Sequence, residues 1–355
     1  MNGLTVMLIA LVALACGYFG YARWREKTWG IDPNRPTPAV ENKSGDYAPA
    51  NKWTVFAHQF TSITGAGPVT GPIIAAMFGW LPALLWMLIG GIFFGAVQDF
   101  TALYASVKNG GRSIGMIIED YIGRTGRRLF LLFCWLFTLL VIAAFCDMVA
   151  NTFNGFAKDG SQIMPNAAAG SISLLYMFVA VLFGLYLKKF RPTAGIQLVV
   201  GIVLMCLMLW VGIANPIYLD SVTWRYVVFA YLFAASVMPM WLLKQPRDYL
   251  SMFLLIGMIV CGVLGVFVKN PTLNMPAFVG FEVKNLDLFP ILFVTIACGA
   301  VSGFQSLVSS GTSSKMVANE KDMRLVGYGS MCVEVVLGIV ALVSVCAAAS
   351  SGVLP

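Results

Sequence analysis

Long apolar runs separated by short polar loops make up most of this chain. An α-helix needs about 20 apolar residues to cross the hydrocarbon core of a bilayer. The pattern therefore predicts ten transmembrane helices, over residues 3–21, 58–78, 81–105, 128–152, 170–187, 193–213, 224–243, 248–268, 288–312 and 325–350. The first run has neither the basic start nor the cleavage site of a signal peptide, so we interpret it as a helix that stays in the membrane.

Basic residues alternate between the predicted loops. All but four of the 23 lysines and arginines fall in every second loop, beginning with the long loop at 22–57. Basic residues in short loops favour the cytoplasm, so these loops are predicted to be cytoplasmic, with both ends of the chain outside. The alternation also predicts a tight helical hairpin at Gly79-Trp80, with Trp80 as an anchor at the outer interface.

The composition agrees with this pattern, since 59% of the 355 residues are hydrophobic and only 11% are charged. An ordinary soluble domain is about 45–50% apolar and about 25% charged. We therefore predict an all-α polytopic membrane protein with one transmembrane domain over residues 1–355. The net charge of +7 resides in the loops, where it reports orientation and does not indicate a nucleic acid partner.

The residue types needed for most enzyme chemistry are missing or scattered. The eight cysteines all lie in apolar runs, and His58 is the one histidine, whereas metal sites need clustered ligands. There is no P-loop for a nucleotide, and no histidine neighbours the serines near residue 306 that a hydrolase would need to activate. We expect no enzyme activity, no cofactor and no metal.

The second predicted helix breaks the rules of helix formation. Residues 64–72 hold three glycines and two prolines at membrane depth, which removes backbone hydrogen bonds and lowers the cost of leaving the helix. Transporters use such breaks to bind ions and substrates at half-helix ends. A proline kink or close helix packing through small residues is the alternative.

A second polar stretch, residues 298–314, closes the ninth predicted helix with serines, a threonine and a glutamine. The loop pattern makes this helix run opposite to the second one. Two interrupted helices of opposite direction are typical of an inverted-repeat transporter. The stretch Ser236-Val237-Met238-Pro239 in the seventh helix is a rival for the second break.

Charged side chains at membrane depth are functional candidates by default. Three acids qualify, namely Asp99, Asp147 and Glu334, and each has the alternative of a pairing with arginine or a position near a helix end. His58 lies where the basic loop 22–57 enters the broken helix. It is either a capping residue or a member of a proton path.

Several stretches resemble the carbon starvation protein A family of bacterial inner-membrane transporters. They span nearly the whole chain in the family's order, and they are residues 32–39, 58–72, 95–100, 111–115, 247–251 and 296–320. Two positions differ from the family, because Gln59 and Gln305 stand where members commonly carry histidine. Members also continue well beyond this length, so the chain resembles the front part of a longer protein.

The resemblance implies uptake of peptides or pyruvate during carbon starvation, a stress response, with proton coupling in the case of pyruvate. It also implies a LeuT/APC-like inverted-repeat core, incomplete in this chain. A membrane nutrient sensor that binds the same ligand and signals through a partner is the alternative function, and a passive channel is a third. Two partners are left open, namely further copies of this chain in a homo-oligomer and a missing C-terminal segment.

The resulting hypothesis is a proton-coupled importer of a small carboxylated nutrient. The residues predicted to bind the substrate come from the two breaks, and they are Thr64, Gly65, Gly67, Thr70, Gly71, Ser302, Gln305, Ser309, Ser310 and Thr312. The residues predicted to carry the proton are His58, Asp99, Asp147 and Glu334. Pyruvate and peptide are not distinguished, since both present a carboxylate to a helix N-terminus.

Overall fold

The protein is helical almost throughout in the computed structural model, which describes residues 2–42, 47–157, 159–190, 192–238, 242–283, 285–301 and 303–349. By length and apolar composition, eight helices in the described part of the chain can cross a membrane. The other two predicted segments contain shorter apolar helices, Gly67–Phe78 and Ser221–Val237. The strands of this part are β1 (Glu282–Val283) and β2 (Leu286–Asp287), which pair antiparallel. The prediction of a polytopic helical membrane protein is confirmed.

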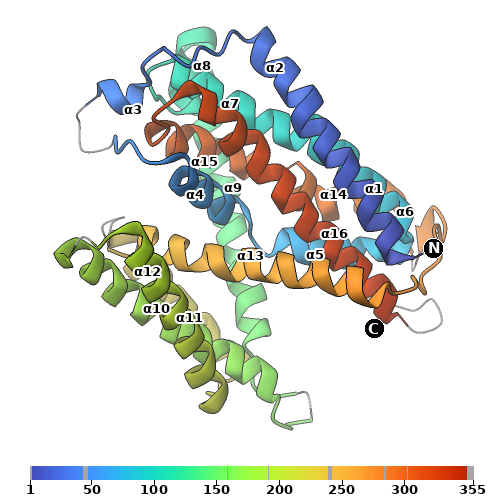
Figure 1. The fold of residues 1–355 in the computed structure, drawn as a ribbon. Coiled ribbons are helices and arrows are strands. Elements are labelled where there is room, and N and C mark those ends of the chain that lie inside the picture. The colour runs from blue at the N-terminus through green and yellow to red at the C-terminus, as the bar shows by residue number, and fades with distance from the viewer. Residues whose placement is uncertain are drawn as a thin grey trace. The chain divides into compact units, whose positions relative to one another are not determined.

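The chain divides into two compact units, one formed by Met1–Tyr121 with Leu254–Pro355 and the other by Ile122–Phe253. The first unit combines both ends of the sequence (Figure 1). Its elements before the second unit are α1 (Gly3–Cys16), η1 (Gly17–Ala22), α2 (Arg23–Thr28), α3 (Pro38–Glu41), α4 (Lys52–Ile63), α5 (Gly67–Ala75), η2 (Ala76–Phe78), α6 (Trp80–Ile89), η3 (Gly90–Gly95), α7 (Ala96–Lys108) and α8 (Ile114–Ile122). Those after it are α14 (Leu288–Ala300), α15 (Gly303–Gly311), η4 (Ser313–Lys315), η5 (Glu320–Asp322), η6 (Arg324–Gly329) and α16 (Ser330–Ala348).

Three loops that the basic pattern places on the cytoplasmic side meet at one end of the first unit. Glu320 accepts hydrogen bonds from the Lys108 ammonium at 2.8 Å and from the Asp32 backbone N–H at 3.1 Å. Thr37 donates to the Val317 carbonyl at 2.7 Å. Glu320 is 1% exposed, so this buried acid joins three segments that are far apart in the sequence.

The opposite end of the first unit holds the hairpin predicted at Gly79. The helix ends at Phe78, Gly79 has a φ of +107°, and α6 begins at Trp80. An added side chain at Gly79 would lie 2.5 Å from the Ala277 carbonyl oxygen. Trp80 was predicted as an interface anchor, but this is wrong, because its side chain is buried in the core of the unit.

The second unit is a group of long apolar helices. They are α9 (Arg124–Thr152), α10 (Met164–Phe190), α11 (Ala194–Ala214), α12 (Ser221–Val237) and the start of α13 (Lys244–Lys269), which continues into the first unit. Phe183, Met208 and Leu250 form a small buried core between them. Many other apolar side chains are exposed, for example Leu140 at 68% and Trp210 at 72%, which suits helices that face lipid.

Candidate functional site

The second predicted helix is broken in the structure. Helix α4 ends at Ile63 and α5 starts at Gly67, with Thr64 in extended conformation between them. Pro68 stands in the first turn of α5, where a proline is tolerated because its missing N–H would have no helical partner. The sequence therefore stops one helix and starts another within three residues.

The ninth predicted helix is broken as well. Helix α14 ends at Ala300, Val301 leaves the helical conformation with φ −152° and ψ 59°, and α15 starts at Gly303. Ser302, one of the predicted substrate-binding residues, lies outside the described residues. Both breaks thus leave the C-terminus of one half-helix and the N-terminus of the next inside the first unit.

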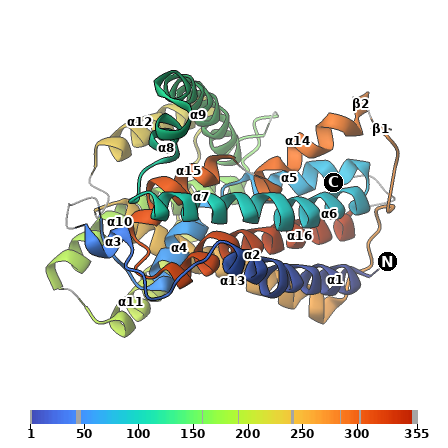
Figure 2. The same cartoon turned by 90° about the horizontal axis from the view of Figure 1, so that it is seen from above.

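The two broken helices run antiparallel and touch at their breaks. Helices α5 and α14 lie side by side in both views (Figures 1 and 2). A Cβ placed on Gly67 would meet the side chain of Cys298, and one placed on Gly71 would lie 2.5 Å from the carbonyl oxygen of Thr295. Because only glycine leaves room for this approach, the glycines predicted to bind substrate also serve close packing, the alternative noted from the sequence.

Side chains of α4 and α15 join the other halves of the broken helices. The Gln59 amide donates to Ser309 Oγ at 2.8 Å, and Ser313 Oγ donates to the amide oxygen of Gln59 at 2.6 Å. His58 Nε2 lies 3.1 Å from Thr312 Oγ1. The Thr312 hydroxyl also lies 3.0 Å from the Val308 carbonyl oxygen, to which it can donate.

Helix α7 lies on the other side of α15. The Gln98 amide donates to Ser306 Oγ at 2.7 Å, and Ser106 Oγ lies 3.0 Å from the Ser310 carbonyl oxygen. The Ser310 hydroxyl donates to the carbonyl of Ser306 one turn earlier. The polar face of α15 is therefore held between α4 and α7.

Two acids lie fully buried beside this polar face. Glu334 in α16 accepts a hydrogen bond from the Gln305 amide at 2.7 Å. Asp99 in α7 has no hydrogen-bond partner for either carboxyl oxygen among the described residues, and Glu334 Oε1 and Gln305 Oε1 have none either. The helices that carry these two acids, α7 and α16, contact each other in the first unit. To bury one ionised carboxylate without a partner costs several kcal/mol. These two carboxyls therefore need a proton or a cation.

Each buried acid follows a π-helical turn. The π-helix η3 ends at Gly95, shortly before Asp99, and η6 ends at Gly329, shortly before Glu334. The Tyr328 hydroxyl donates to the Ile92 carbonyl at 3.0 Å and so joins η6 to η3. A π-turn changes the direction of the side chains that follow it and is frequent at functional sites.

The remaining predicted residues have different surroundings. The Thr64 hydroxyl is buried and has no hydrogen-bond partner in the described part of the chain, and the Thr70 hydroxyl donates to the Ala66 carbonyl at 3.0 Å. Asp147 belongs to the second unit, where it forms a partly exposed ion pair with Arg225 at 2.7 Å. This pairing is the alternative noted for Asp147 from the sequence.

The sequence reasoning missed Gln59, Gln98 and Ser313 as members of the polar network. Each lies within four residues of a residue that was named, and Gln98 directly precedes Asp99. A polar side chain at membrane depth was the available signal. Which of the many serines face a partner helix depends on the packing of α15, so only the structure could select them.

Relatives of known description cover most of this chain. It is 38% identical to the pyruvate/proton symporter BtsT of Escherichia coli K12, over 90% of this chain and 45% of that protein. It is 38% identical to the peptide transporter CstA of the same organism, over 97% of this chain and 50% of the relative, and 35% identical to the peptide transporter CstA of Bacillus subtilis, over 97% and 58%. No solved structure matches the chain.

The chain spans about half the length of the curated relatives that it matches. The family model described as carbon starvation protein CstA matches residues 2–353, nearly the whole sequence. This agrees with the resemblance found in the breaks and around the buried acids. The chain belongs to the carbon starvation protein CstA family, a bacterial family of multi-pass membrane transporters and not of enzymes.

Proposed function

We propose that this chain is part of a proton-coupled secondary transporter that imports a small carboxylated nutrient, pyruvate or a short peptide, across the bacterial plasma membrane. The observation that carries the proposal is the pair of buried, incompletely bonded carboxyls, Asp99 and Glu334, beside two helix breaks that touch. The E. coli relatives described as a pyruvate/proton symporter and a peptide transporter support the substrate class. Ten crossings and an inverted-repeat core are part of this proposal.

The substrate carboxylate binds at the N-terminus of α5, beside the contact between the two breaks. At the N-terminus of α5, the N–H groups of Val69 and Thr70 already bond to the Ala66 carbonyl, and Pro68 has none. Among the described residues, the Gly67 N–H and the Thr64 hydroxyl have no hydrogen-bond partner. They are therefore donors that this break offers, and the dipole of α5 favours an anion there. From the other break, the predicted contributors are Ser302, Gln305, Ser309, Ser310 and Thr312, and Gly65 and Gly71 shape the approach.

The proton is carried by Asp99 and Glu334. Two carboxyls that share a buried site do not both ionise readily, because like charges repel and the interior solvates them poorly. A proton that binds to Asp99 or Glu334 therefore changes the charge near the bound substrate carboxylate. This change couples proton binding to substrate binding. His58, at the α4 end of the polar network, relays protons between the network and the loop 22–57. We assign no transport step to Asp147, which is paired with Arg225.

Uptake measurements in proteoliposomes test the proposal. We expect accumulation of labelled pyruvate or labelled dipeptide that increases when the gradient drives protons inward. Asp99→Asn and Glu334→Gln should abolish the response to the gradient while the protein still folds, since both changes keep the size of the side chain. Uptake that ignores the gradient in the unmodified protein would refute proton coupling.

Matched controls are available on exposed acids of the same unit. Glu282→Gln and Asp287→Asn remove the same charges at exposed positions, and we expect their gradient response to equal that of the unmodified protein. If these controls lose the response as the buried variants do, the effect is not specific to the pair. Ligand-dependent stabilisation without any flux would instead support the sensor alternative.

A further inference from the structure

Two hollows lie along one seam of the first unit, between the first helix (Gly3–Thr28) and the last (Glu320–Ala348). The first is apolar and the second is basic. Along each of the two helices, residues that line the hollows recur about once every helical turn. On the first helix these positions are Ala15, Phe19, Arg23 and Lys27, and on the last helix they are Val333, Gly329, Leu325 and Lys321. Arg324 of the second hollow lies over the ring of Tyr18 in the first, so the two hollows adjoin, and we call them together the groove.

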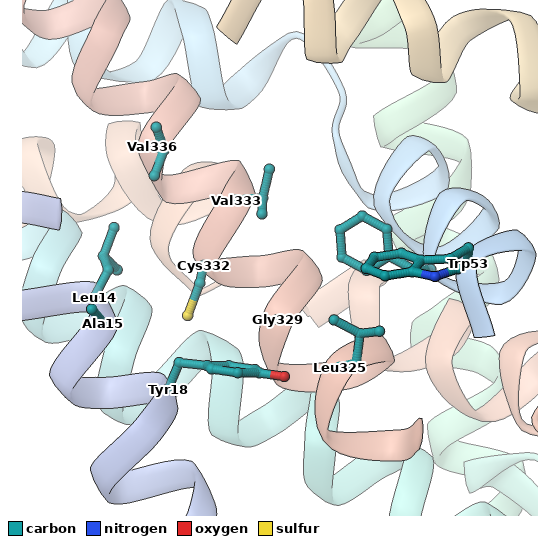
Figure 3. A pocket seen from close by; sticks show the side chains of 10 residues that line it. Leu14, Ala15, Tyr18, Trp53, Leu325, Gly329, Cys332, Val333 and Val336 are labelled. Carbon is teal, nitrogen blue, oxygen red and sulfur yellow. The ribbon is translucent and has the colours of Figure 1, made fainter. Parts of the chain in front are cut away.

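The apolar part has a volume of about 340 Å³, which is within the usual size of a small-molecule site. Figure 3 shows Leu14, Tyr18, Cys332 and Val333 around it, with Trp53 at its edge. Trp53 is 59% exposed, so this part of the groove opens to the outside of the unit. At membrane depth, an open apolar groove faces lipid chains and not water.

The basic part has a volume of about 500 Å³ and is lined by four basic residues and one acid. The acid, Glu26, pairs with Arg324 at 2.7 Å. In the described part of the chain no ion pair joins Arg23, Lys27 or Lys321 to an acidic residue. The Nε of Arg324 is buried and has no partner there either. This part of the groove is therefore prepared for an anion.

Aromatic side chains mark the level at which the groove changes from apolar to basic. The Arg324 guanidinium lies over the ring of Tyr18, 5.2 Å from its centre, and Arg25 lies over the ring of Trp24 at 4.9 Å. Trp24 is 54% exposed. Tryptophan and tyrosine concentrate where a membrane protein passes from hydrocarbon to headgroups, so the junction of the two hollows lies at headgroup level.

We propose that this groove binds an anionic phospholipid, with its phosphate between Arg23, Lys27 and Lys321 and one acyl chain in the apolar part beside Tyr18 and Val333. Basic pockets between transmembrane helices on the cytoplasmic side are suited to anionic headgroups, and the basic loops place this end of the unit there. A transmembrane protein segment would fill the apolar part but would leave three basic side chains uncompensated. A free phosphate would leave the apolar part open.

Native mass spectrometry of the purified full chain, titrated with phosphatidylglycerol or with phosphatidylcholine of the same acyl chains, tests the proposal. We expect tighter binding of phosphatidylglycerol. Arg23→Gln with Lys321→Gln should weaken that binding by about 30-fold, since each basic residue near an anionic surface contributes roughly a factor of five. The matched control is Arg128→Gln with Lys189→Gln, which removes one exposed arginine and one exposed lysine outside the groove and should change the binding less than twofold.

The apolar half is tested separately. Ala15→Phe places a ring in the groove from an exposed position and should weaken the binding of both lipids. Val12→Phe, on the same helix but outside the lining, should leave the binding of both lipids unchanged. Inorganic phosphate should not displace the lipid. Equal affinity for the two lipids, a loss as large in the charge controls, an Ala15→Phe variant that still binds normally, or displacement by phosphate would each overturn the proposal. A protein segment found in the groove would also overturn it.

Discussion

The contact between Gly67 in α5 and Cys298 in α14 provides the sharpest test of how the two broken helices meet. A Cβ on Gly67 would lie 2.6 Å from Cys298 Sγ and still closer to its Cβ. Carbon atoms in good contact are about 3.5–4.0 Å apart, so Gly67→Ala must push the helices apart by about 1 Å. Overpacking of this kind costs about 1–3 kcal/mol.

The same geometry predicts a rescue. Cys298→Gly removes both clashing atoms, and the nearest remaining atom, the Cα of residue 298, would be 3.8 Å from the new methyl group. By itself, Cys298→Gly should cost about 1 kcal/mol, because glycine is a poorer helix former than cysteine and the side-chain contact of Cys298 is lost. The double variant should therefore lose only about 1 kcal/mol, where independent effects would add to about 2–4 kcal/mol.

Reversible unfolding in mixed micelles, followed by circular dichroism, measures the four free energies of this cycle. Gly265→Ala is the control, because a Cβ there meets nothing within 4 Å, and the change should stabilise α13 by up to about 1 kcal/mol. Additive losses in the Gly67→Ala and Cys298→Gly variants would show that α5 and α14 do not touch at this point. The juxtaposition of the two breaks, and the substrate site built on it, would then be wrong.

Three further predictions concern stability. Glu320→Ala should lower the free energy of unfolding by about 2–3 kcal/mol in the same assay, because Lys108 loses a charged hydrogen-bond partner, and an unchanged value would show that the loops do not meet there. Tyr328→Phe should cost about 1–3 kcal/mol, since the buried carbonyl in η3 loses its donor; a neutral effect would argue against the junction of η6 and η3. The Thr223 hydroxyl donates to Asp220 and lowers the pKa of that carboxyl. The ionised Asp220 therefore stabilises the fold above its unfolded pKa, about 3.9, and this stabilisation is lost as the pH falls through the folded pKa. Asp220→Ala should therefore show a weaker loss of stability below about pH 4, and an unchanged acid profile would refute this.

The sequence by itself determined the class of the protein and the places where its helices fail. The apolar runs and the alternation of basic loops predicted a polytopic helical protein, the hairpin at Gly79 and the opposite directions of the two interrupted helices, because these features depend on local composition and on the bilayer. Residues 64–72 and 298–314 were recognised as breaks for the same reason, since proline, glycine and serine act on the backbone close to them in sequence.

Only the tertiary structure decided which polar groups meet. It placed Gln305 against Glu334, Gln59 against Ser309, and Asp147 beside Arg225, and it buried Trp80, which the sequence suggested for the interface. These outcomes depend on the rotation and spacing of helices that are far apart in the chain, and short sequence patterns carry no information about either. The carboxyl pair and the basic end of the groove arise in the same way, from the packing of the first and last parts of the chain into one unit.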